Sequence, residues 1–426
     1  MIQLTFFGAM AEVGASGMLL DNGTGKILMD YGASTEVTPA RPPLPVGGKV
    51  NSVVLSHGHV DHCGSLPQIT RQSNAPIYSA ECTKDITEML LYDSLKINMQ
   101  EAGNIEGAKL PFVKQDVKNT VRNFREMPYR RQFNVPGAKV TLFDAGHIPG
   151  SAMTYVDMGA KKFLYTGNHN MIDTRLLKGC DMRLPPIDVL ITESTYSDRD
   201  HPDRKTQEKE LIDIVTQTVS NGGIALIPSF AVGRAQELLL ILEQEGIDYP
   251  VYMDGMAKKA TTIINRHKKL LRDPKELDET LKKVRYVTTQ KHRAKVVKDP
   301  CAIITTSGML SGGPTNSYMK MLHDDENSSL VLTGWQAHDS PGKLLLETGR
   351  YVNTEEKVDV DVRMRVRRLD FSAHLGRKHL WEFFERTRPK KIFCVHGDHT
   401  EEFAQELNNK GWDAVAPIAN NRSFRF

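Results

Sequence analysis

Apolar and polar positions alternate along the chain in short blocks, and these blocks predict the secondary structure. Strand-like runs rich in β-branched and aromatic residues recur between polar turns. They are "MIQLTFFG", "GMLLDNGTGKILMDYG", "VNSVVLSHGH", "AKVTLFDAGH", "KKFLYTGNHN", "IDVLITEST", "KKIFCVHG" and "WDAVAPI". The second run contains the turn sequence "DNGTG" and therefore predicts two strands. Residues 84–132 are charged, contain few breakers and predict helix.

The pattern changes near residue 198. An amphipathic helix is predicted first, and strand, helix and strand follow it. The four segments are "RKTQEKELIDIVTQTVSNGG", "IALIPSF", "GRAQELLLILEQEG" and "YPVYMDG". The alternation continues through "CAIITTSG" and "SLVLTGW" and ends near residue 360. Alternating strands and helices predict a parallel sheet, so the chain is of the α/β class.

The composition is that of a globular protein. The 426 residues suffice for two cores, or for one domain with a large insertion, and 40% hydrophobic with 25% charged residues excludes disorder. Five scattered cysteines without a CxxC pair favour reduced thiols. The N-terminus has no basic leader, and no apolar run is long enough to span a membrane. We therefore expect a cytoplasmic protein without a membrane partner.

The sequence "LSHGHVDHCG" places His57, His59, Asp61 and His62 within six positions. The cluster follows a β-branched run, so we expect it on the loop at the C-terminal end of a strand, where α/β folds place ligands. His57 and His59 can reach one metal, and Asp61 and His62 can turn to a second. Imidazoles and a carboxylate suit zinc. The alternative is a polar surface loop in which these residues occur by chance, and four metal-binding side chains within six positions argue against it.

Three more residues have similar surroundings. His147 in "DAGHIPGSA", His396 in "IFCVHGD" and Asp30 in "ILMDYG" each follow or end a β-rich run. A lone histidine after a strand is more often structural than a metal ligand. Three such residues, each at a predicted strand end, indicate a common site.

These motifs resemble the metallo-β-lactamase fold, in the order HxHxDH, GHxxGSA, TG-x-x-N and VHGD. Five further stretches resemble the β-CASP nucleases, namely "ITESTYSDR", "PSFAVGRAQE", "TTSGMLSGGP", "TGWQAHDSPG" and "DFSAHLGR". The chain looks most similar to archaeal homologues of the cleavage and polyadenylation factor nuclease and to archaeal RNase J. The resemblance implies an αββα sandwich, residues 1–197 and 361–426, with an inserted β-CASP α/β domain, residues 198–360. We expect no N-terminal KH domains of the kind that some archaeal relatives carry.

The resemblance also implies roles for individual residues. One Zn²⁺ would be held by His57, His59 and His147, and a second by Asp61, His62 and His396, while Asp30 would orient a ligand imidazole. His374 would be the general acid, and its pairing with Glu193 would favour the protonated form. The active form would thus bind two Zn²⁺ per chain and hydrolyse phosphodiester bonds, with Asp61 part of the catalytic set.

One position departs from the family pattern. "LYTGNHN" has Asn168 where the family has an aspartate that bridges the two metals. An amide is neutral and offers one weak oxygen, so we expect lower metal occupancy and impaired activity. His169 is a poor replacement because neighbouring side chains of an extended stretch point to opposite sides. Asn168 marks either a naturally inactive member or a replaced aspartate, and the intact remaining motifs favour the second.

The resemblance makes single-stranded RNA the expected partner. Basic clusters occur at residues 130–131, 258–259 and 268–269 and in "RMRVRR" (363–368), where a strand would present arginines on one face. The candidates for RNA contacts are Arg234, Ser307, His338, Arg365 and Arg367. "SGMLSGGP" could offer backbone N–H groups to a phosphate.

Three functions compete. The first is a zinc-dependent ribonuclease in RNA processing or decay, with endonuclease and 5′–3′ exonuclease modes both open. The second is a non-catalytic RNA-binding subunit, which Asn168 permits. The third is a small-molecule hydrolase such as a thioesterase, which the inserted region and His374 disfavour. A homodimer is also open.

Overall fold

The computed structural model describes residues 1–426 except 36–39, 104–108 and 245–248. The chain divides into two compact units. Unit 1 comprises residues Met1–Asp173, Lys178–Asp200 and Ala373–Phe426, and unit 2 comprises Thr174–Leu177 and His201–Ser372. The predicted α/β class, with a second α/β region interrupting the first, is confirmed.

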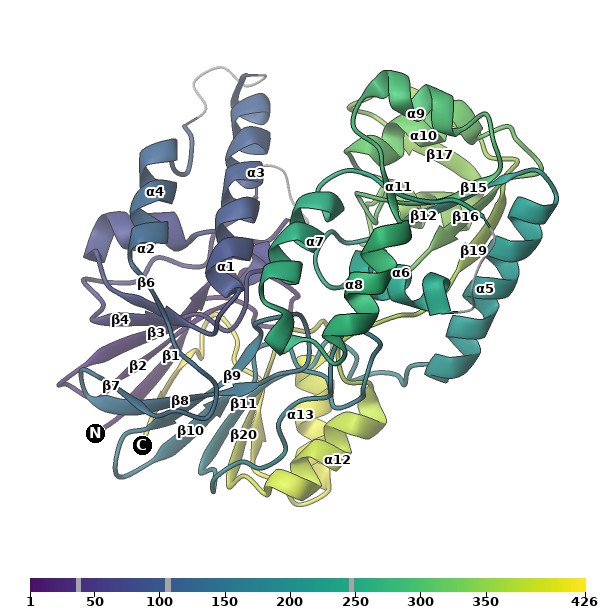
Figure 1. Ribbon diagram of the computed structural model, residues 1–426. Helices are drawn as coiled ribbons and strands as arrows, with labels where there is room; N and C mark the ends of the chain where they lie inside the picture. Colours follow the sequence, from purple (N-terminus) through teal and green to yellow (C-terminus); the bar gives the residue numbers. More distant parts are fainter. Residues whose placement is uncertain (36–39, 104–108, 245–248) are drawn as a thin grey trace. The chain divides into compact units, whose positions relative to one another are not determined.

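Unit 1 contains two seven-stranded sheets (Figure 1). The first has the order β22 (Ser423–Arg425), β1 (Gln3–Phe6), β2 (Gly17–Asp21), β3 (Lys26–Tyr31), β4 (Ser52–Val54), β5 (Ile77–Ser79) and β6 (Phe124–Glu126). The second has the order β21 (Ala414–Val415), β20 (Lys391–Val395), β11 (Val189–Glu193), β10 (Lys162–Tyr165), β9 (Ala152–Asp157), β8 (Ala138–Asp144) and β7 (Phe133–Val135). Strands β2 and β3 pair in antiparallel fashion, as the turn "DNGTG" predicts.

The two sheets of unit 1 pack face to face, and helices cover both outer faces. Residues of both sheets form one buried cluster, in which the rings of Phe6 and Phe393 lie 5.4 Å apart. Leu66 of α2 packs on the outer face of the first sheet, and Phe383 of α12 on that of the second. The helices of unit 1 are α1 (Val60–Cys63), α2 (Leu66–Ser73), α3 (Thr83–Gly103), α4 (Lys114–Arg122), α12 (Arg377–Thr387) and α13 (Thr400–Asn409). Apolar side chains are therefore buried between the two sheets and between each sheet and its helices. This layer order is the expected αββα sandwich.

Several parts of unit 1 differ from the sequence-based expectation, which did not include the short strands β5, β7 and β22. The predicted helical region 84–132 also contains the edge strand β6, which pairs in parallel with β5. Two of the three β6 residues are exposed and charged, so the strand has no apolar pattern to reveal it. Strand β9 was not predicted, because five of its six residues are buried and no alternation appears in its sequence.

Unit 2 contains a six-stranded parallel sheet and a two-stranded hairpin. The sheet order is β14 (Arg285–Tyr286), β13 (Val251–Met253), β15 (Cys301–Thr305), β12 (Ile224–Pro228), β16 (Ser329–Leu332) and β19 (Arg365–Arg368), and the hairpin joins β17 (Arg350–Asn353) to β18 (Val358–Asp361). The helices are α5 (Arg204–Ser220), α6 (Arg234–Gln244), α7 (Ala257–Arg266), η1 (Lys268–Leu270), α8 (Pro274–Lys283), α9 (Gln290–Val296), α10 (Pro314–Leu322) and α11 (Pro341–Thr348). Buried residues of α5 and α6 pack on one face of the sheet, and those of α10 and α11 on the other. The parallel sheet follows from the alternation of strands and helices.

The divisions between the units lie later in the chain than the sequence suggested. The second division falls between Ser372 and Ala373 instead of 360 and 361, because β19 pairs in parallel with β16 and so belongs to the sheet of unit 2. The first falls between Asp200 and His201 instead of 197 and 198.

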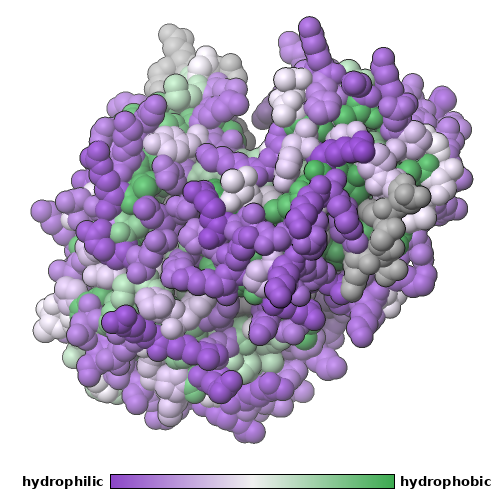
Figure 2. All heavy atoms as spheres, viewed as in Figure 1, coloured by the Kyte–Doolittle hydropathy of each residue, from purple (hydrophilic) through white to green (hydrophobic). Residues whose placement is uncertain are grey.

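Hydrophilic side chains dominate the face seen in Figure 2. None of the helices formed by the described residues combines the length and apolar character that a bilayer crossing requires.

Candidate metal centre

The predicted metal ligands gather at one edge of the sheets of unit 1, where strands end. His57 and His59 follow β4, His147 follows β8, Asn168 follows β10, and His396 comes directly after β20. Strands β10, β11 and β20 are parallel neighbours, and β3 is parallel to β4, so their C-terminal ends meet at the same edge.

Local backbone geometry brings these segments unusually close. A Cβ atom at Gly32 would lie 1.8 Å from the carbonyl oxygen of Asp61, so only glycine allows the metal loop to approach β3. Asp30 and His396 have φ angles of 55° and 53°, in the left-handed region that non-glycine residues rarely adopt. Such conformations cluster at functional sites, where the surrounding structure holds them.

His57, His59 and His147 form the first group of donor atoms. The Nδ1 atom of His59 lies 3.2 Å from Nε2 of His57 and 3.2 Å from Nε2 of His147. A tetrahedral zinc site with bonds of 2.0–2.1 Å has ligand atoms about 3.3–3.4 Å apart, so these separations suit a shared metal. All three donor atoms lie within 4.8 Å of one another.

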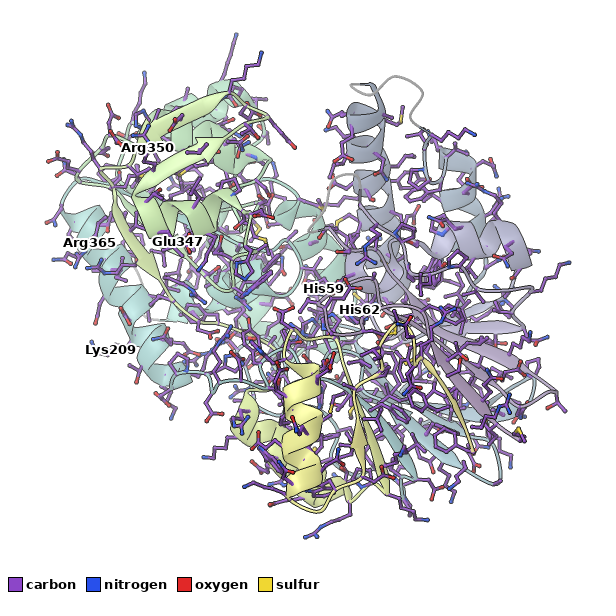
Figure 3. The ribbon with its side chains drawn as sticks, turned by 180° about the vertical axis from the view of Figure 1, so that it is seen from behind. His59, His62, Lys209, Glu347, Arg350 and Arg365 are labelled. Atoms are coloured by element: carbon purple, nitrogen blue, oxygen red, sulfur yellow. The ribbon has the colours of Figure 1, made fainter. Side chains whose placement is uncertain are left out.

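Asp61, His62 and His396 form the second group. Oδ2 of Asp61 lies 3.1 Å from Nε2 of His396 and 3.3 Å from Nε2 of His62 (His59 and His62 are labelled in Figure 3). His57 also places a ring nitrogen within 4.8 Å of Asp61 and His62. The two groups are therefore adjacent, with His57 between them.

Hydrogen bonds behind the ligands fix which ring nitrogen faces the donor groups. Oδ2 of Asp30 accepts hydrogen bonds from Nδ1 of His62, from the Ser56 hydroxyl and from the Tyr165 hydroxyl, each 2.7 Å long. Because the Ser56 hydroxyl donates to Asp30, it accepts from Nδ1 of His57, 3.0 Å away. Both imidazoles thereby turn Nε2 toward the donor groups, as ligands in metal sites generally do.

The two remaining Nδ1 atoms are held by the chain near residues 195 and 373. Nδ1 of His147 donates to the carbonyl oxygen of Ala373 at 2.8 Å. Nδ1 of His396 lies 3.1 Å from the Thr195 hydroxyl, which donates to Oε2 of Glu193 at 2.6 Å. This donor set of imidazoles and one carboxylate fits zinc.

The two groups differ in electrostatics. Burial, reinforced by neighbouring imidazoles, lowers the pKa of His57 and His147 well below the usual value, so both are neutral. Burial also opposes the charged form of His62, but Asp61 and Asp30 outweigh it and raise the pKa of His62 to about 10. For Asp61, burial is outweighed by His62 and His396, which hold its pKa well below the usual value.

Glu193 and His374 form a pair beside both groups. Oε2 of Glu193 accepts a hydrogen bond from Nδ1 of His374 at 2.6 Å. The His374 ring lies 4.6 Å from that of His147 and is nearly parallel to that of His396, at 6.4 Å. Burial favours the neutral carboxyl of Glu193, but attraction to His374 and hydrogen bonds from His169 and His374 hold its pKa well below the usual value.

Asn168 is buried between the groups that support the centre. The preceding Gly167 lies against Ser56, since a Cβ there would be 2.7 Å from that of Ser56. The following residue, His169, donates its backbone N–H to Oε1 of Glu193 at 2.7 Å. The Oδ1 atom of Asn168 is buried and accepts no hydrogen bond from any described residue. An orphan oxygen at this place can accept a partner from outside the chain, such as a bound cation.

The His169 side chain points to Glu193 and to the core. Its Nδ1 atom is 3.4 Å from Oε1 of Glu193, and its ring lies 4.8 Å from that of Phe383. His169 is not part of either donor group found among the described residues. It supports the Glu193–His374 pair instead of replacing a bridging carboxylate.

The candidate RNA contacts all lie in unit 2. The Arg234 guanidinium donates to the carbonyl oxygen of Thr333, so it joins the ends of α6 and β16. Ser307 holds its own loop through a hydrogen bond from the Gly312 N–H at 3.1 Å, so that N–H is already occupied. His338 is exposed. Their contacts with RNA stay a prediction.

Arg365 and Arg367 lie on the edge strand β19, as the alternating pattern predicts. Both are exposed, while the intervening Val366 is half-buried. Arg365, labelled in Figure 3, donates to Oε1 of Gln217 in α5 at 2.6 Å. Their role in RNA binding likewise stays a prediction.

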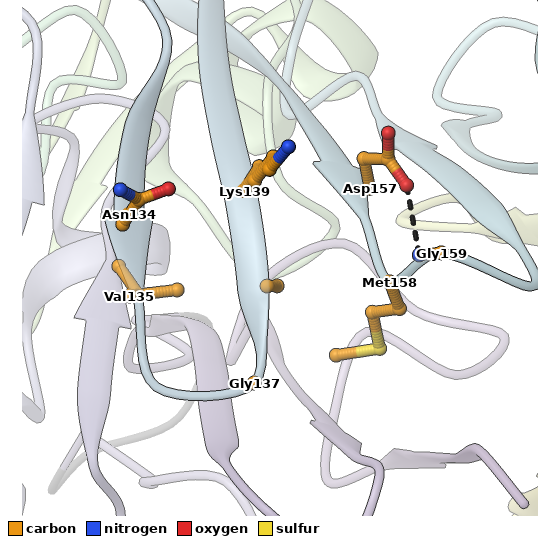
Figure 4. Close-up of a pocket in the computed structure, with 8 residues that line it drawn as sticks. Asn134, Val135, Gly137, Lys139, Asp157, Met158 and Gly159 are labelled. Carbon is orange, nitrogen blue, oxygen red and sulfur yellow. Dashed lines mark hydrogen bonds between the residues drawn. The ribbon is translucent and has the colours of Figure 1, made fainter.

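A pocket of about 440 Å³ (Figure 4) lies where β8 begins, at the end of that strand opposite to His147. It is lined by the turn between β7 and β8 and by the end of β9, with Lys139 and Asp157 as its charged residues. Strand β8 begins there and ends near His147. None of the predicted site residues lines this pocket.

Sequence analysis missed the hydroxyl groups that support the centre. They belong to Ser56, Tyr165 and Thr195. Ser56 directly precedes His57, and Thr195 lies two residues after Glu193. This proximity in sequence is the only signal that could have indicated their supporting role. Single hydroxyl residues have no spacing rule that points to this role.

Three family models match successive parts of the chain. They are "Metallo-beta-lactamase superfamily domain" over residues 18–195, "Beta-Casp domain" over 235–345 and "Zn-dependent metallo-hydrolase RNA specificity domain" over 359–417. "Probable RNase MJ4" of Methanocaldococcus jannaschii is 36% identical over 98% of this chain and 98% of its own length. "RNase aCSPSF2" of Saccharolobus solfataricus is 34% identical over 94% of this chain and 80% of its own. A crystal structure of a protein of unknown function from Enterococcus faecalis V583 shares the fold, with a TM-score of 0.62, 13% identity and 99% of each chain covered.

Proposed function

Because the chain belongs to the β-CASP family of metallo-β-lactamase-fold, metal-dependent nucleases, we propose that it is a zinc-dependent ribonuclease acting on single-stranded RNA, with activity lowered by Asn168. One observation carries this proposal: two adjacent donor groups lie beside the Glu193–His374 pair. His57, His59 and His147 would hold one zinc ion, and Asp61, His62 and His396 a second. Zinc at such sites lowers the pKa of water and stabilises negative charge on phosphoryl oxygens.

His374 would protonate the leaving ribose oxygen. Its Nδ1 is committed to Glu193, so the proton would come from Nε2. Glu193 is itself fixed by the His169 N–H and the Thr195 hydroxyl, which keeps the carboxylate and hence the His374 ring in one orientation. General acid catalysis of this kind requires a held donor beside the reacting group.

Asn168→Asp tests the proposal most directly. A carboxylate at this position would offset the repulsion between two cations, which an amide cannot do. We expect bound zinc to rise toward two equivalents and RNA cleavage to increase by a factor on the order of 10²–10³, since metal stabilisation is worth several kcal/mol. Zinc content by elemental analysis and cleavage of end-labelled RNA measure the two effects.

The double variant Asn168→Asp, His57→Ala is the matched control. It keeps the new carboxylate but lacks a ligand, so any cleavage it shows comes from a contaminating nuclease. The proposal fails if the present chain already holds two zinc ions and cleaves as fast as Asn168→Asp. Cleavage of RNA with a 5′-monophosphate, RNA with a 5′-triphosphate and circular RNA is then compared. Because circular RNA has no 5′ end, its cleavage indicates the endonuclease mode.

A non-catalytic RNA-binding subunit is the second candidate, and Asn168 is the observation that favours it. It requires that Asn168→Asp binds RNA and two zinc ions without cleaving. A small-molecule hydrolase gains no support from the match to an RNA specificity domain over residues 359–417. The homodimer stays a prediction, which light scattering would test.

A further inference from the structure

Positive charge is concentrated in one stretch of unit 2. Residues 258–298 contain fourteen lysines and arginines and four carboxylates, a net charge of +10, whereas the whole chain carries +3. The rest of the chain is therefore negative, at −7. Charge of one sign gathered in a single segment repels itself, and it attracts polyanions.

The last part of this stretch has no acidic residue. Residues 285–298 form the edge strand β14 and the helix α9, and they contain five lysines and arginines. Arg293 is neutralised by the buried Asp254, whose Oδ2 accepts from its Nε at 2.6 Å. Lys291, Lys295 and Lys298 are exposed and form no ion pair with a described residue. Their spacing places them on one side of α9 and its C-terminal extension.

Aromatic rings lie beside Arg285, the cation of the edge strand β14. Tyr286, on the edge strand, is 40% exposed, which makes it one of the few large exposed rings among the described residues. The Tyr252 ring lies between the Arg285 guanidinium, 5.8 Å from its centroid, and the His292 ring at 6.4 Å. The Tyr252 ring, on β13, thus contacts both Arg285 of β14 and His292 of α9. Cations interleaved with exposed rings are the composition of surfaces that bind single-stranded nucleic acid.

Protection of a sheet edge is the competing explanation. A charged residue on an edge strand discourages pairing with another chain, and this accounts for Arg285 on β14. It does not account for the lysines of α9 and of the segment that follows it, or for an exposed tyrosine. Within α9, Lys291 and Lys295 are also like charges four residues apart, a spacing that slightly destabilises a helix. The nearest following carboxylate is that of Asp299.

We propose that Arg285, Tyr286, Lys291, Lys295 and Lys298 form a second RNA-binding surface, here named the basic edge. The lysines and Arg285 would neutralise phosphates, and Tyr286 would stack on a base. This inference rests on the proposed function, because it takes RNA as the ligand. It concerns binding alone and involves none of the residues of the metal centre.

The salt dependence of RNA affinity tests the charges of the basic edge. The chain as it stands, in chelator, is titrated with fluorescent single-stranded RNA at salt concentrations from about 50 to about 200 mM. The triple variant Lys291→Gln, Lys295→Gln, Lys298→Gln should give a slope of log K against log salt that is shallower by about 2, since each phosphate contact contributes about 0.7.

The control variant removes the same charge elsewhere. Lys114→Gln, Lys118→Gln, Arg122→Gln changes three exposed cations of α4, spaced along one helix of unit 1. Its slope should equal that of the parent chain. An unchanged slope in the α9 variant, or an equal reduction in both variants, overturns the proposal. Thermal unfolding confirms that both variants are folded.

Tyr286 separates stacking from charge. Tyr286→Ala should weaken RNA binding about fivefold to thirtyfold without changing the salt slope, because stacking releases no counterions. Tyr286→Phe keeps the ring and should bind within about twofold of the parent chain. Equal affinity of Tyr286→Ala and the parent overturns the stacking role.

These results are distinguishable from failure of the proposed function. If Asn168→Asp cleaves RNA while the α9 variant keeps its salt slope, only the basic edge is wrong. If Asn168→Asp does not cleave RNA but the α9 variant loses its slope, ribonuclease activity is wrong and the basic edge stands.

Discussion

The two donor groups of unit 1 differ in charge and in what supports them. The first consists of three imidazoles, and burial lowers the pKa of two of them, His57 and His147, so that these two are neutral. The second combines a carboxylate with His62, whose pKa is raised to about 10. Asn168, with its orphan Oδ1, stands where the resemblance to the family implies a further carboxylate.

The difference shows how one amide can affect the groups unequally. Neutral imidazoles bind a cation without needing an anion at position 168. A second cation about 3.5–4 Å away is repelled by the first, and a shared carboxylate offsets that repulsion. The present chain should therefore bind its first metal well and its second poorly.

His374 adjoins both groups, so its removal should have the largest effect. In the Asn168→Asp background, His374→Ala should lower turnover roughly 10²–10⁴-fold while RNA affinity stays nearly constant, because a lost proton donor affects the transition state. Single-turnover cleavage and equilibrium binding measure the two quantities. An equal loss of binding and turnover would mean that His374 only positions the substrate.

Much of the fold could be predicted from local pattern. The alternation after residue 198 predicted the parallel sheet of unit 2, and the strand-end positions predicted which loops would meet. Strands β6 and β9 were missed because one is exposed and charged and the other is buried on both faces. The late division at Ser372 depends on the pairing of β19 with β16, which no local sequence signal reveals.

The site was predictable only where residues carry distinctive chemistry. Histidines and carboxylates are rare enough in such spacing to indicate a metal centre, and the structure brings them together. The supporting hydroxyls of Ser56, Tyr165 and Thr195 act through contacts between segments distant in sequence. Their roles arise from tertiary structure, so the sequence could not indicate them.

Removing one ligand from each group tests the comparison itself. In the present chain, His59→Ala should lower the affinity for the first zinc by more than about 100-fold. Loss of the hydrogen-bond partner of a ligand costs about 10–100-fold, and loss of the ligand itself should cost more. His396→Ala should leave the affinity for that first zinc unchanged, because His396 belongs to the second group, which we expect to bind its metal weakly. Zinc titration with a competing chelator measures both. Equal losses in the two variants would show that the groups do not differ as described.

Thr195 should have the smallest effect on zinc binding, and that effect should be confined to the second group. Its hydroxyl donates to Glu193 and lies 3.1 Å from Nδ1 of His396, so it fixes the ring orientation of one ligand of that group. Thr195→Val keeps the shape but removes the hydroxyl. In the Asn168→Asp background it should weaken the second zinc about 10–100-fold, the usual effect of losing a supporting hydrogen bond, and leave the first zinc unaffected. Thr195→Ser keeps the hydroxyl and should bind the second zinc as the Asn168→Asp parent does. If Thr195 only filled space, Thr195→Ser would bind that zinc no better than Thr195→Val. Ser56→Ala is the matched change, because it removes the hydroxyl behind His57. If Ser56→Ala weakened zinc binding and Thr195→Val did not, Thr195 would not orient the second group.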